Sequence, residues 1–154
     1  MQSESIQFEY PCGWTLDTYP QSNLPYRPLA YFSTNTGEAF GDLQILDATG
    51  FVGNLDEVGQ KNLALAQNEA GFHLVGFNPD VKLGIKRANT LMYEYSYADP
   101  DIGSNSLNRV VETSFDLYGK IIVTRFEAMA YIIDGESAFS QQVPEVNTVI
   151  NSIK

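Results

Sequence analysis

Two side chains that often carry chemistry are nearly absent, and basic residues are few. The 154 residues include one cysteine and one histidine, which excludes an intramolecular disulfide and every Cys-rich zinc site. Nine lysines and arginines stand against nineteen acidic residues, for a formal net charge of −10. Because phosphate contacts need clustered basic side chains, we expect no binding to nucleic acid or to an anionic membrane surface.

Long apolar runs are missing as well. No stretch approaches the roughly 20 apolar residues that a membrane-spanning helix needs, so we expect no membrane insertion of the domain. Residues 1–5 lack the basic and apolar regions of a signal peptide. Two interpretations stay open, a cytoplasmic chain or the mature part of an exported one.

Apolar residues are nevertheless abundant. They make up 44% of the chain, which excludes a disordered protein. The length suits one domain with a two-layer core, and no repeat or linker divides it. We therefore expect a single domain over residues 1–154.

Alternation of apolar and polar residues predicts short strands along most of the chain. An Asn78-Pro79-Asp80 turn is expected after the fifth strand, and Tyr118-Gly119 predicts a tight antiparallel hairpin between the last two. The strands are expected at residues 6–10, 14–17, 29–33, 42–47, 72–77, 90–97, 109–117 and 120–129.

Two segments have the pattern of helices. Asn54 followed by Glu57 indicates a helix N-cap, and Gly71 suits the position just beyond the last turn. An apolar face at helical spacing predicts a second helix over residues 137–152, and Pro144 is expected either near its first turn or at a bend in it. Strands, a helix, more strands and a helix indicate an α+β fold, a central antiparallel β-sheet flanked by helices.

The two ends of the chain resemble the PsbP-like family. Residues 8–14 (Phe-Glu-Tyr-Pro-Cys-Gly-Trp) resemble its aromatic-x-Tyr-Pro-x-x-Trp opening. Three closing features of that family also have counterparts here: its hairpin at residues 119–123, its acidic connector at 134–136 and its C-terminal helix at 150–154. The terminal Phe common in that family is Ile153 here. The resemblance implies a PsbP-like α-β-α sandwich.

This resemblance also implies a kind of function. The family includes photosystem II extrinsic subunits, bacterial DcrB-like lipoproteins and a yeast nuclear-import factor that binds the GTPase Ran. Most characterised members are accessory binding proteins rather than enzymes, and many act outside the cytoplasm. The resemblance therefore favours a non-catalytic, extracytoplasmic accessory protein with a protein partner, and it transfers no catalytic residue.

One loop has the spacing of a hard-cation site. Asp99, Asp101 and Asn105 place oxygen atoms at alternate positions, as Ca²⁺ or Mn²⁺ would require. An EF-hand would also need a glutamate where Val110 stands. The alternative is a solvated turn between two strands, and no other cofactor is indicated.

Tyrosines supply the candidate surface for a protein partner. Tyr93, Tyr95 and Tyr97 alternate along one strand and so share a face, while Tyr19 and Tyr26 flank a proline-rich loop. The alternative interpretation is packing on the sheet.

Catalytic constellations are weak. His73, the single imidazole, has no located acid or nucleophile, and Cys12 is expected to be buried or packed in a turn. We therefore expect no enzyme. A small-ligand or divalent-cation-binding extracytoplasmic protein is the alternative to the partner-binding hypothesis, and an enzyme with dispersed carboxylates is a third.

Overall fold

The computed structural model describes residues 6–17, 24–34, 41–51, 53–99, 104–130, 132–133 and 136–154. At residues 97, 99, 104, 105, 132, 133 and 136 it describes the backbone alone. The strands are β1 (Thr15–Leu16), β2 (Arg27–Ser33), β3 (Gly41–Asp47), β4 (His73–Leu83), β5 (Lys86–Asp99), β6 (Ser104–Leu117), β7 (Lys120–Met129), β8 (Ile132–Ile133) and β9 (Glu136–Ser137). The helices are α1 (Leu55–Ala66) and α2 (Ala138–Ser152).

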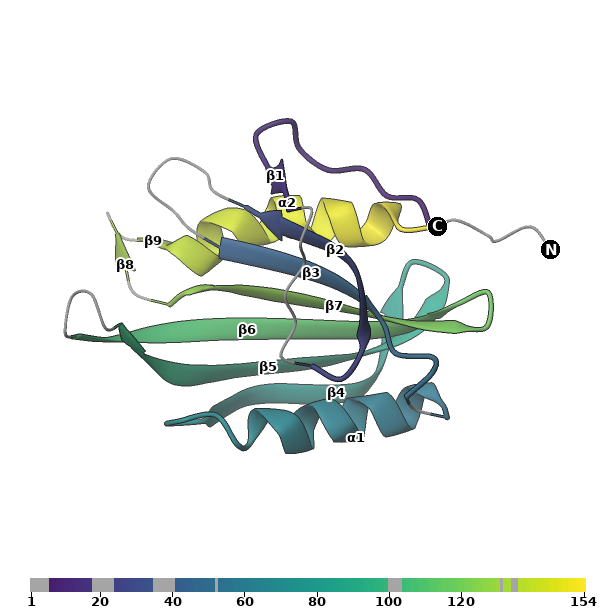
Figure 1. Ribbon diagram of the computed structural model, residues 1–154, viewed down its shortest axis with the longest axis horizontal. Coiled ribbons are helices and arrows are strands. Elements are labelled where there is room, and N and C mark those ends of the chain that lie inside the picture. The colour runs from purple at the N-terminus through teal and green to yellow at the C-terminus, as the bar shows by residue number, and fades with distance from the viewer. Residues whose placement is uncertain are drawn as a thin grey trace.

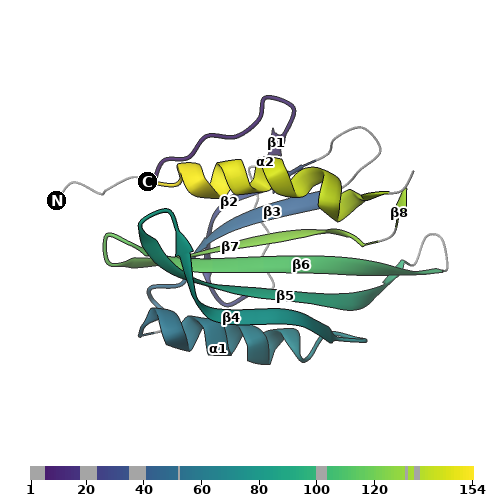
Figure 2. The ribbon, with the colours of Figure 1, turned by 180° about the vertical axis from the view of Figure 1, so that it is seen from behind.

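Seven of these strands form one antiparallel sheet in the order β1-β2-β3-β7-β6-β5-β4. Figures 1 and 2 show α2 against one face of this sheet and α1 against the other. The predicted α+β fold with a central antiparallel sheet is confirmed. Neither helix in the part of the chain described is long and apolar enough to cross a membrane.

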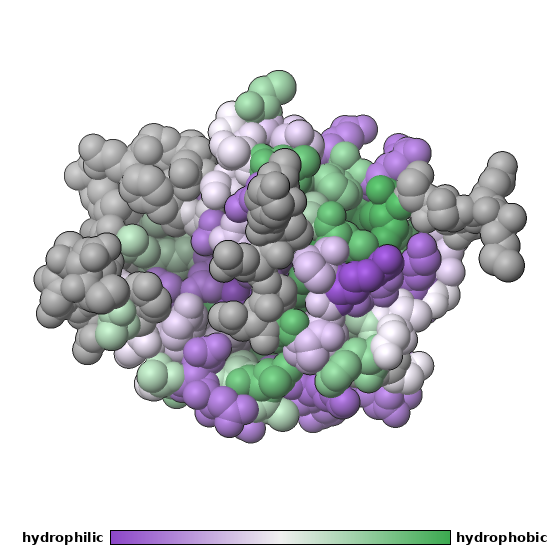
Figure 3. Space-filling view, viewed as in Figure 1, coloured by the Kyte–Doolittle hydropathy of each residue, from purple (hydrophilic) through white to green (hydrophobic). Residues whose placement is uncertain are grey.

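The two faces of the sheet bury different side chains. On the α2 side, Phe139, Val146 and Ile150 of the helix join Ile122 and Phe126 of β7 in the largest apolar cluster. The α1 side has two smaller clusters, in which the helix contributes Leu55, Val58 and Ala66. The exposed residues of α1 are mostly polar, and Figure 3 shows purple atoms mixed with green ones along the lower edge of the molecule.

The hairpin between β6 and β7 matches the prediction from Tyr118-Gly119. Tyr118 and Gly119 have φ values of 53° and 79°, the left-handed conformation that a tight two-residue hairpin turn requires. The Gly119 amide donates to Asp116 Oδ1 at 3.1 Å. Leu117 pairs with Lys120 directly beside the turn, so the turn sets the register of the whole hairpin.

Residues 6–10 are not a strand, and this prediction is wrong. The segment bonds instead to the C-terminal end of the chain. The amide and carbonyl of Gln7 bond to Lys154 at 2.9 and 3.0 Å, and those of Glu9 bond to the Ser152 hydroxyl at 2.8 and 3.3 Å. Phe8 and Tyr10 pack on Phe32, with ring centroids 5.6 and 4.7 Å from it. The aromatic alternation therefore reflects packing against the sheet rather than pairing within it.

Three smaller expectations also need correction. Residues 78–80 lie inside β4, where the register shifts between Asn78 and Val81, because a bulge on an edge strand accommodates Pro79. Helix α1 ends at Ala66, and Gly71 takes its φ of 66° in the turn that follows. Cys12 lies in a turn as expected, but it is exposed rather than buried.

We predict that Asn54→Ala lowers the free energy of unfolding by about 1 kcal/mol. Asn54 Oδ1 accepts from the Glu57 amide at 3.0 Å, and Glu57 Oε2 accepts in turn from the Gly53 amide at 2.8 Å. The measurement is the urea midpoint, with Asn54→Asp as a control that keeps the cap. An unchanged midpoint for Asn54→Ala would contradict the assignment.

Candidate functional site

A cavity of about 650 Å³ lies on the α1 side of the sheet, beside the end of that helix. Strands β2, β3, β7, β6 and β5 provide most of its wall, and the C-terminal end of α1 closes one side. This volume is within the range typical of small-molecule sites. Its described lining consists of Leu24, Tyr31, Asp42, Gln44, Leu65, Ala66, Glu69, Tyr93, Tyr95, Asn108, Glu112, Arg125 and Glu127.

Strand register arranges the polar lining in two rows that run across the sheet. In one row, Arg125 of β7 stands between Glu112 of β6 and Gln44 of β3. In the next row, Glu127 of β7 stands opposite Asp42 of β3. Side chains directly opposite on antiparallel strands lie close enough to interact, so the rows bring together charges that are distant in sequence.

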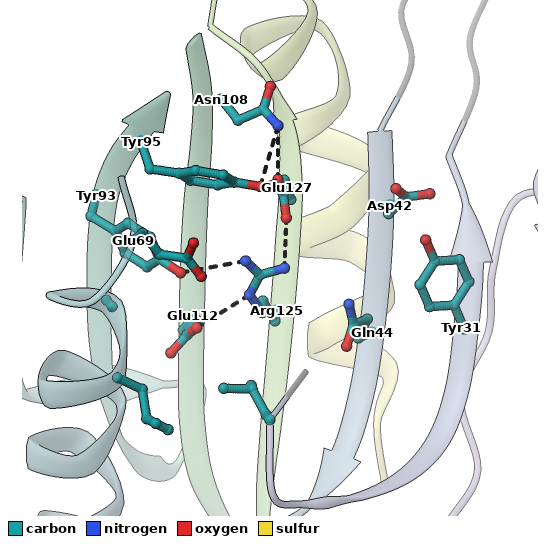
Figure 4. A pocket seen from close by; sticks show the side chains of 13 residues that line it. Tyr31, Asp42, Gln44, Glu69, Tyr93, Tyr95, Asn108, Glu112, Arg125 and Glu127 are labelled. Carbon is teal, nitrogen blue, oxygen red and sulfur yellow. Dashed lines mark hydrogen bonds and ion pairs between the residues drawn. The ribbon is translucent and has the colours of Figure 1, made fainter. Parts of the chain in front are cut away.

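The guanidinium of Arg125 lies at the centre of this arrangement (Figure 4). Its Nε is 3.4 Å from Glu112 Oε1, and its Nη1 is 2.6 Å from Glu127 Oε2. Its Nη2 donates to the Tyr93 hydroxyl at 3.4 Å. Only 12% of the Arg125 side chain is exposed, and its contacts on three sides fix the guanidinium in place.

Glu127 has further partners that Glu112 lacks. The Tyr95 hydroxyl and Asn108 Nδ2 both donate to Glu127 Oε1, the amide at 2.9 Å. Glu112 is 2% exposed, and its Oε2 has no hydrogen-bond partner among the described residues. Gln44 Oε1 is also buried without a hydrogen-bond partner among the described residues. An unpaired buried acceptor is costly, so two residues of the lining each bury an oxygen that lacks a donor.

Burial changes the protonation of these groups. Burial raises the pKa of Glu112 to about 7, although Arg125 acts in the opposite direction. Burial also raises the pKa of Asp42, against a hydrogen bond from Tyr31. Burial disfavours the charge of Arg125, but Glu127, Tyr93 and Glu112 outweigh it and raise the pKa of Arg125. The guanidinium is therefore charged, while Glu112 is divided between its two forms near neutral pH.

The described lining shows tyrosine rings and polar groups but no cluster of metal-ligating side chains. Within the described residues, no three His, Cys, Asp or Glu side chains are grouped closely enough to hold a metal. The cavity combines tyrosine rings with fixed polar atoms, and such a combination orients a small molecule.

The structure brings two of the five predicted partner-surface tyrosines into this cavity. Tyr93 and Tyr95 line it, and their rings are 6.4 Å apart. Tyr26 is 4% exposed and donates to Asn62 at 2.7 Å, so it packs under α1. Tyr19 lies outside the described residues, and Tyr97 is described only as backbone of β5.

The proposed hard-cation loop lies mostly outside the described residues. Asp101 is not described, and the side chains of Asp99 and Asn105 are not described either. Their backbones place them where β5 and β6 meet that loop, so Ca²⁺ or Mn²⁺ binding there stays a prediction. His73 is exposed on β4.

The sequence predictions did not include Glu112 or Arg125, although the sequence contains a signal for both. Glu112 follows Val110-Val111, and Arg125 follows an Ile121-Ile122-Val123-Thr124 run. A charged residue in the middle of an apolar strand needs a partner when it is buried. No comparable signal marks Asp42 or Gln44, which sit in an ordinary alternating strand.

We predict that Arg125→Met lowers the free energy of unfolding by about 3 kcal/mol, because it leaves buried carboxylates without a cation. Adding Glu112→Gln to that variant restores part of the loss. The control is Arg27→Met, which breaks the pair with Asp47 at a site where Arg27 is 67% exposed and costs about 1 kcal/mol or less. Equal losses for the two arginines in urea unfolding would contradict the central role of Arg125.

The stability of the protein also depends on pH through Glu112. Its pKa rises from 4.5 to about 7 on folding, so the folded state holds a proton that the unfolded state releases between these values. The contribution of Glu112 to the free energy of unfolding is therefore complete below about pH 4.5. As the pH rises to 7 this contribution is lost, which lowers the free energy of unfolding by up to about 3 kcal/mol. Glu112→Gln removes this loss, whereas Glu9→Gln, on an exposed residue, keeps it. Parallel stability profiles for wild type and Glu112→Gln from pH 5 to 8 would contradict the assignment.

Comparison with known proteins gives a fold and no family. No family model matches the chain, and no curated protein matches it. Among solved structures, the protein of unknown function PA94 from Pseudomonas aeruginosa has a TM-score of 0.60 at 14% identity, over 92% of this chain and 96% of that one. LpqN, involved in cell envelope biogenesis of Mycobacterium tuberculosis, has a TM-score of 0.55 at 19% identity, over 94% of this chain and 79% of that one. The chain shares the fold of these two proteins, and membership of the PsbP-like family stays a prediction.

Proposed function

We propose that this protein is a non-catalytic binding protein that holds a small polar molecule in the cavity beside α1. The observation that carries the proposal is the unpaired Oε2 of Glu112, on a side chain that is 2% exposed and lines the cavity. Gln44 Oε1 adds a second buried acceptor in the same wall. A ligand with donors at these positions removes both penalties.

A binding role fits the lining better than a catalytic one. Arg125 and Glu127 are engaged with each other, and the hydroxyls of Tyr93 and Tyr95 are engaged with them. The described lining includes no Ser, Thr, Cys or Lys nucleophile and no His base. Fixed polar groups of this kind position a ligand.

We also propose an accessory, extracytoplasmic role, with a protein partner as the second candidate function. LpqN, which shares the fold, is involved in cell envelope biogenesis. The resemblance to PsbP-like proteins likewise favours a location outside the cytoplasm. A protein partner is favoured by Leu74 and Val75, which are 42% and 45% exposed on the edge strand β4. Exposed apolar residues on a sheet edge suit the addition of a partner's strand.

The cavity is tested by blocking it. Leu65 lines the cavity and is 37% exposed, so Leu65→Trp adds a large ring to the wall at a partly exposed position. Its control is Leu16→Trp, on β1, where Leu16 is 45% exposed. The probes are benzylamine, benzyl alcohol, benzoate and glucose, and the measurement is the shift of backbone amide resonances.

We expect at least one probe to shift amides in β3, β6 and β7 around Gln44, Glu112 and Arg125. The Leu65→Trp variant loses these shifts, and the Leu16→Trp variant keeps them. The absence of shifts around the cavity with all four probes would overturn the proposed function, as would shifts that Leu65→Trp leaves intact.

A further inference from the structure

We infer that the ligand of this cavity is a small organic cation with N–H donors, such as a primary amine, and that the free oxygen of Glu112 accepts from it. This inference rests on the proposed function and names the class of its ligand. It follows from the charge of the lining, from the way Arg125 is already used and from the position of the two free acceptors.

The described lining carries an excess of negative charge. It contains four carboxylates, Asp42, Glu69, Glu112 and Glu127, and one guanidinium, that of Arg125. Full ionisation would leave three negative charges in excess. Glu69 is exposed, but the excess is unfavourable at the other carboxylates, which are buried or half-buried. A cationic ligand reduces this excess, whereas a carboxylate or phosphate increases it.

Arg125 does not complete the coordination of Glu112. Its Nη1 makes the closer contact, at 2.6 Å, with Glu127, and its Nη2 donates to Tyr93. Only Nε is directed to Glu112, at 3.4 Å and to Oε1. Glu112 Oε2 is therefore left for a donor from elsewhere, and the carboxylate has the capacity to accept it.

The two free acceptors lie on either side of Arg125 in one row of the sheet. Glu112 and Gln44 are the cross-strand neighbours of Arg125, and each has a buried oxygen without a partner. A primary ammonium carries three donors and no acceptor, so it meets such oxygens without leaving a group of its own unpaired. The rings of Tyr31, Tyr93 and Tyr95 in the same lining provide surfaces that attract cations.

Binding of a cation has a consequence for protons. Because the pKa of Glu112 is raised to about 7, a cation beside it favours the ionised form and expels a proton into solvent. Affinity therefore increases as the pH rises from 6 to 8. Several other titratable or charged groups interact electrostatically with Glu112. They are Arg125 and Glu127 of β7, Tyr93 of β5, Glu69 beyond α1 and Tyr26 before β2.

The experiment compares four probes that share a ring and differ in charge and donors: benzylamine, benzyltrimethylammonium, benzyl alcohol and benzoate. Calorimetry on the full chain at pH 6, 7 and 8, in two buffers of different ionisation enthalpy, measures affinity and proton release together. The variants are Glu112→Gln and, as a control with the same change in net charge, Glu9→Gln. Circular dichroism verifies that both variants are folded.

We expect benzylamine to bind at least about tenfold more tightly than benzyl alcohol or benzyltrimethylammonium, since a charged donor makes the stronger hydrogen bond. Its binding releases protons and tightens with pH. Glu112→Gln weakens it at least about tenfold and abolishes the proton release, while Glu9→Gln changes neither.

Two results overturn the inference and leave the proposed function standing. One is cavity binding by benzyl alcohol or benzoate that equals or exceeds that of benzylamine. The other is benzylamine binding in the cavity that Glu112→Gln does not weaken. Failure of the proposed function is a different result, because then no probe of any charge shifts the cavity amides.

Discussion

The strict alternation of side chains along the β6–β7 hairpin is the constraint on which the rest of the structure depends. Successive residues of a strand point to opposite faces, so Ile122 and Phe126 join the core under α2 while Arg125 and Glu127 face the other side. A slip of one residue would place both charges in the α2 core. The tight turn at Tyr118 and Gly119 prevents that slip by fixing the first pair of the ladder.

This constraint divides the α1 side of the sheet into an apolar and a polar part. Where α1 packs on the sheet, Leu46, Val58 and Val123 form a buried apolar contact. Farther along β3 and β7, Gln44 and Arg125 replace Leu46 and Val123, and a cavity takes the place of the helix. The protein thus keeps an incompletely paired carboxylate where an apolar side chain would be less costly, and such local departures from good packing mark functional sites.

Much of the fold was predictable because its signals are local. The Asn54 cap, the hairpin turn and the alternation of β7 are all set by residues within a few positions of each other. The same turn also fixes half of the site. Because Leu117 pairs with Lys120, the residues an equal number of steps away on each strand, Glu112 and Arg125, must pair as well. The other half depends on the pairing of β3 with β7, which joins segments far apart in sequence, and no local pattern reveals it. The packing of residues 6–10 on Phe32 is unpredictable for the same reason.

The position of Trp14, the single tryptophan of the sequence, separates two optical signals. Trp14 is 5% exposed in the cluster under α2, and its Nε1 donates to Glu145 Oε2 at 3.2 Å. The cavity lies on the opposite face and contains tyrosines but no tryptophan among its described lining. Emission excited in the indole band therefore reports whether the α2 layer is assembled. Three of the nine tyrosines, Tyr31, Tyr93 and Tyr95, line the cavity, so a ligand there alters part of the tyrosine absorption while the indole lies on the opposite face.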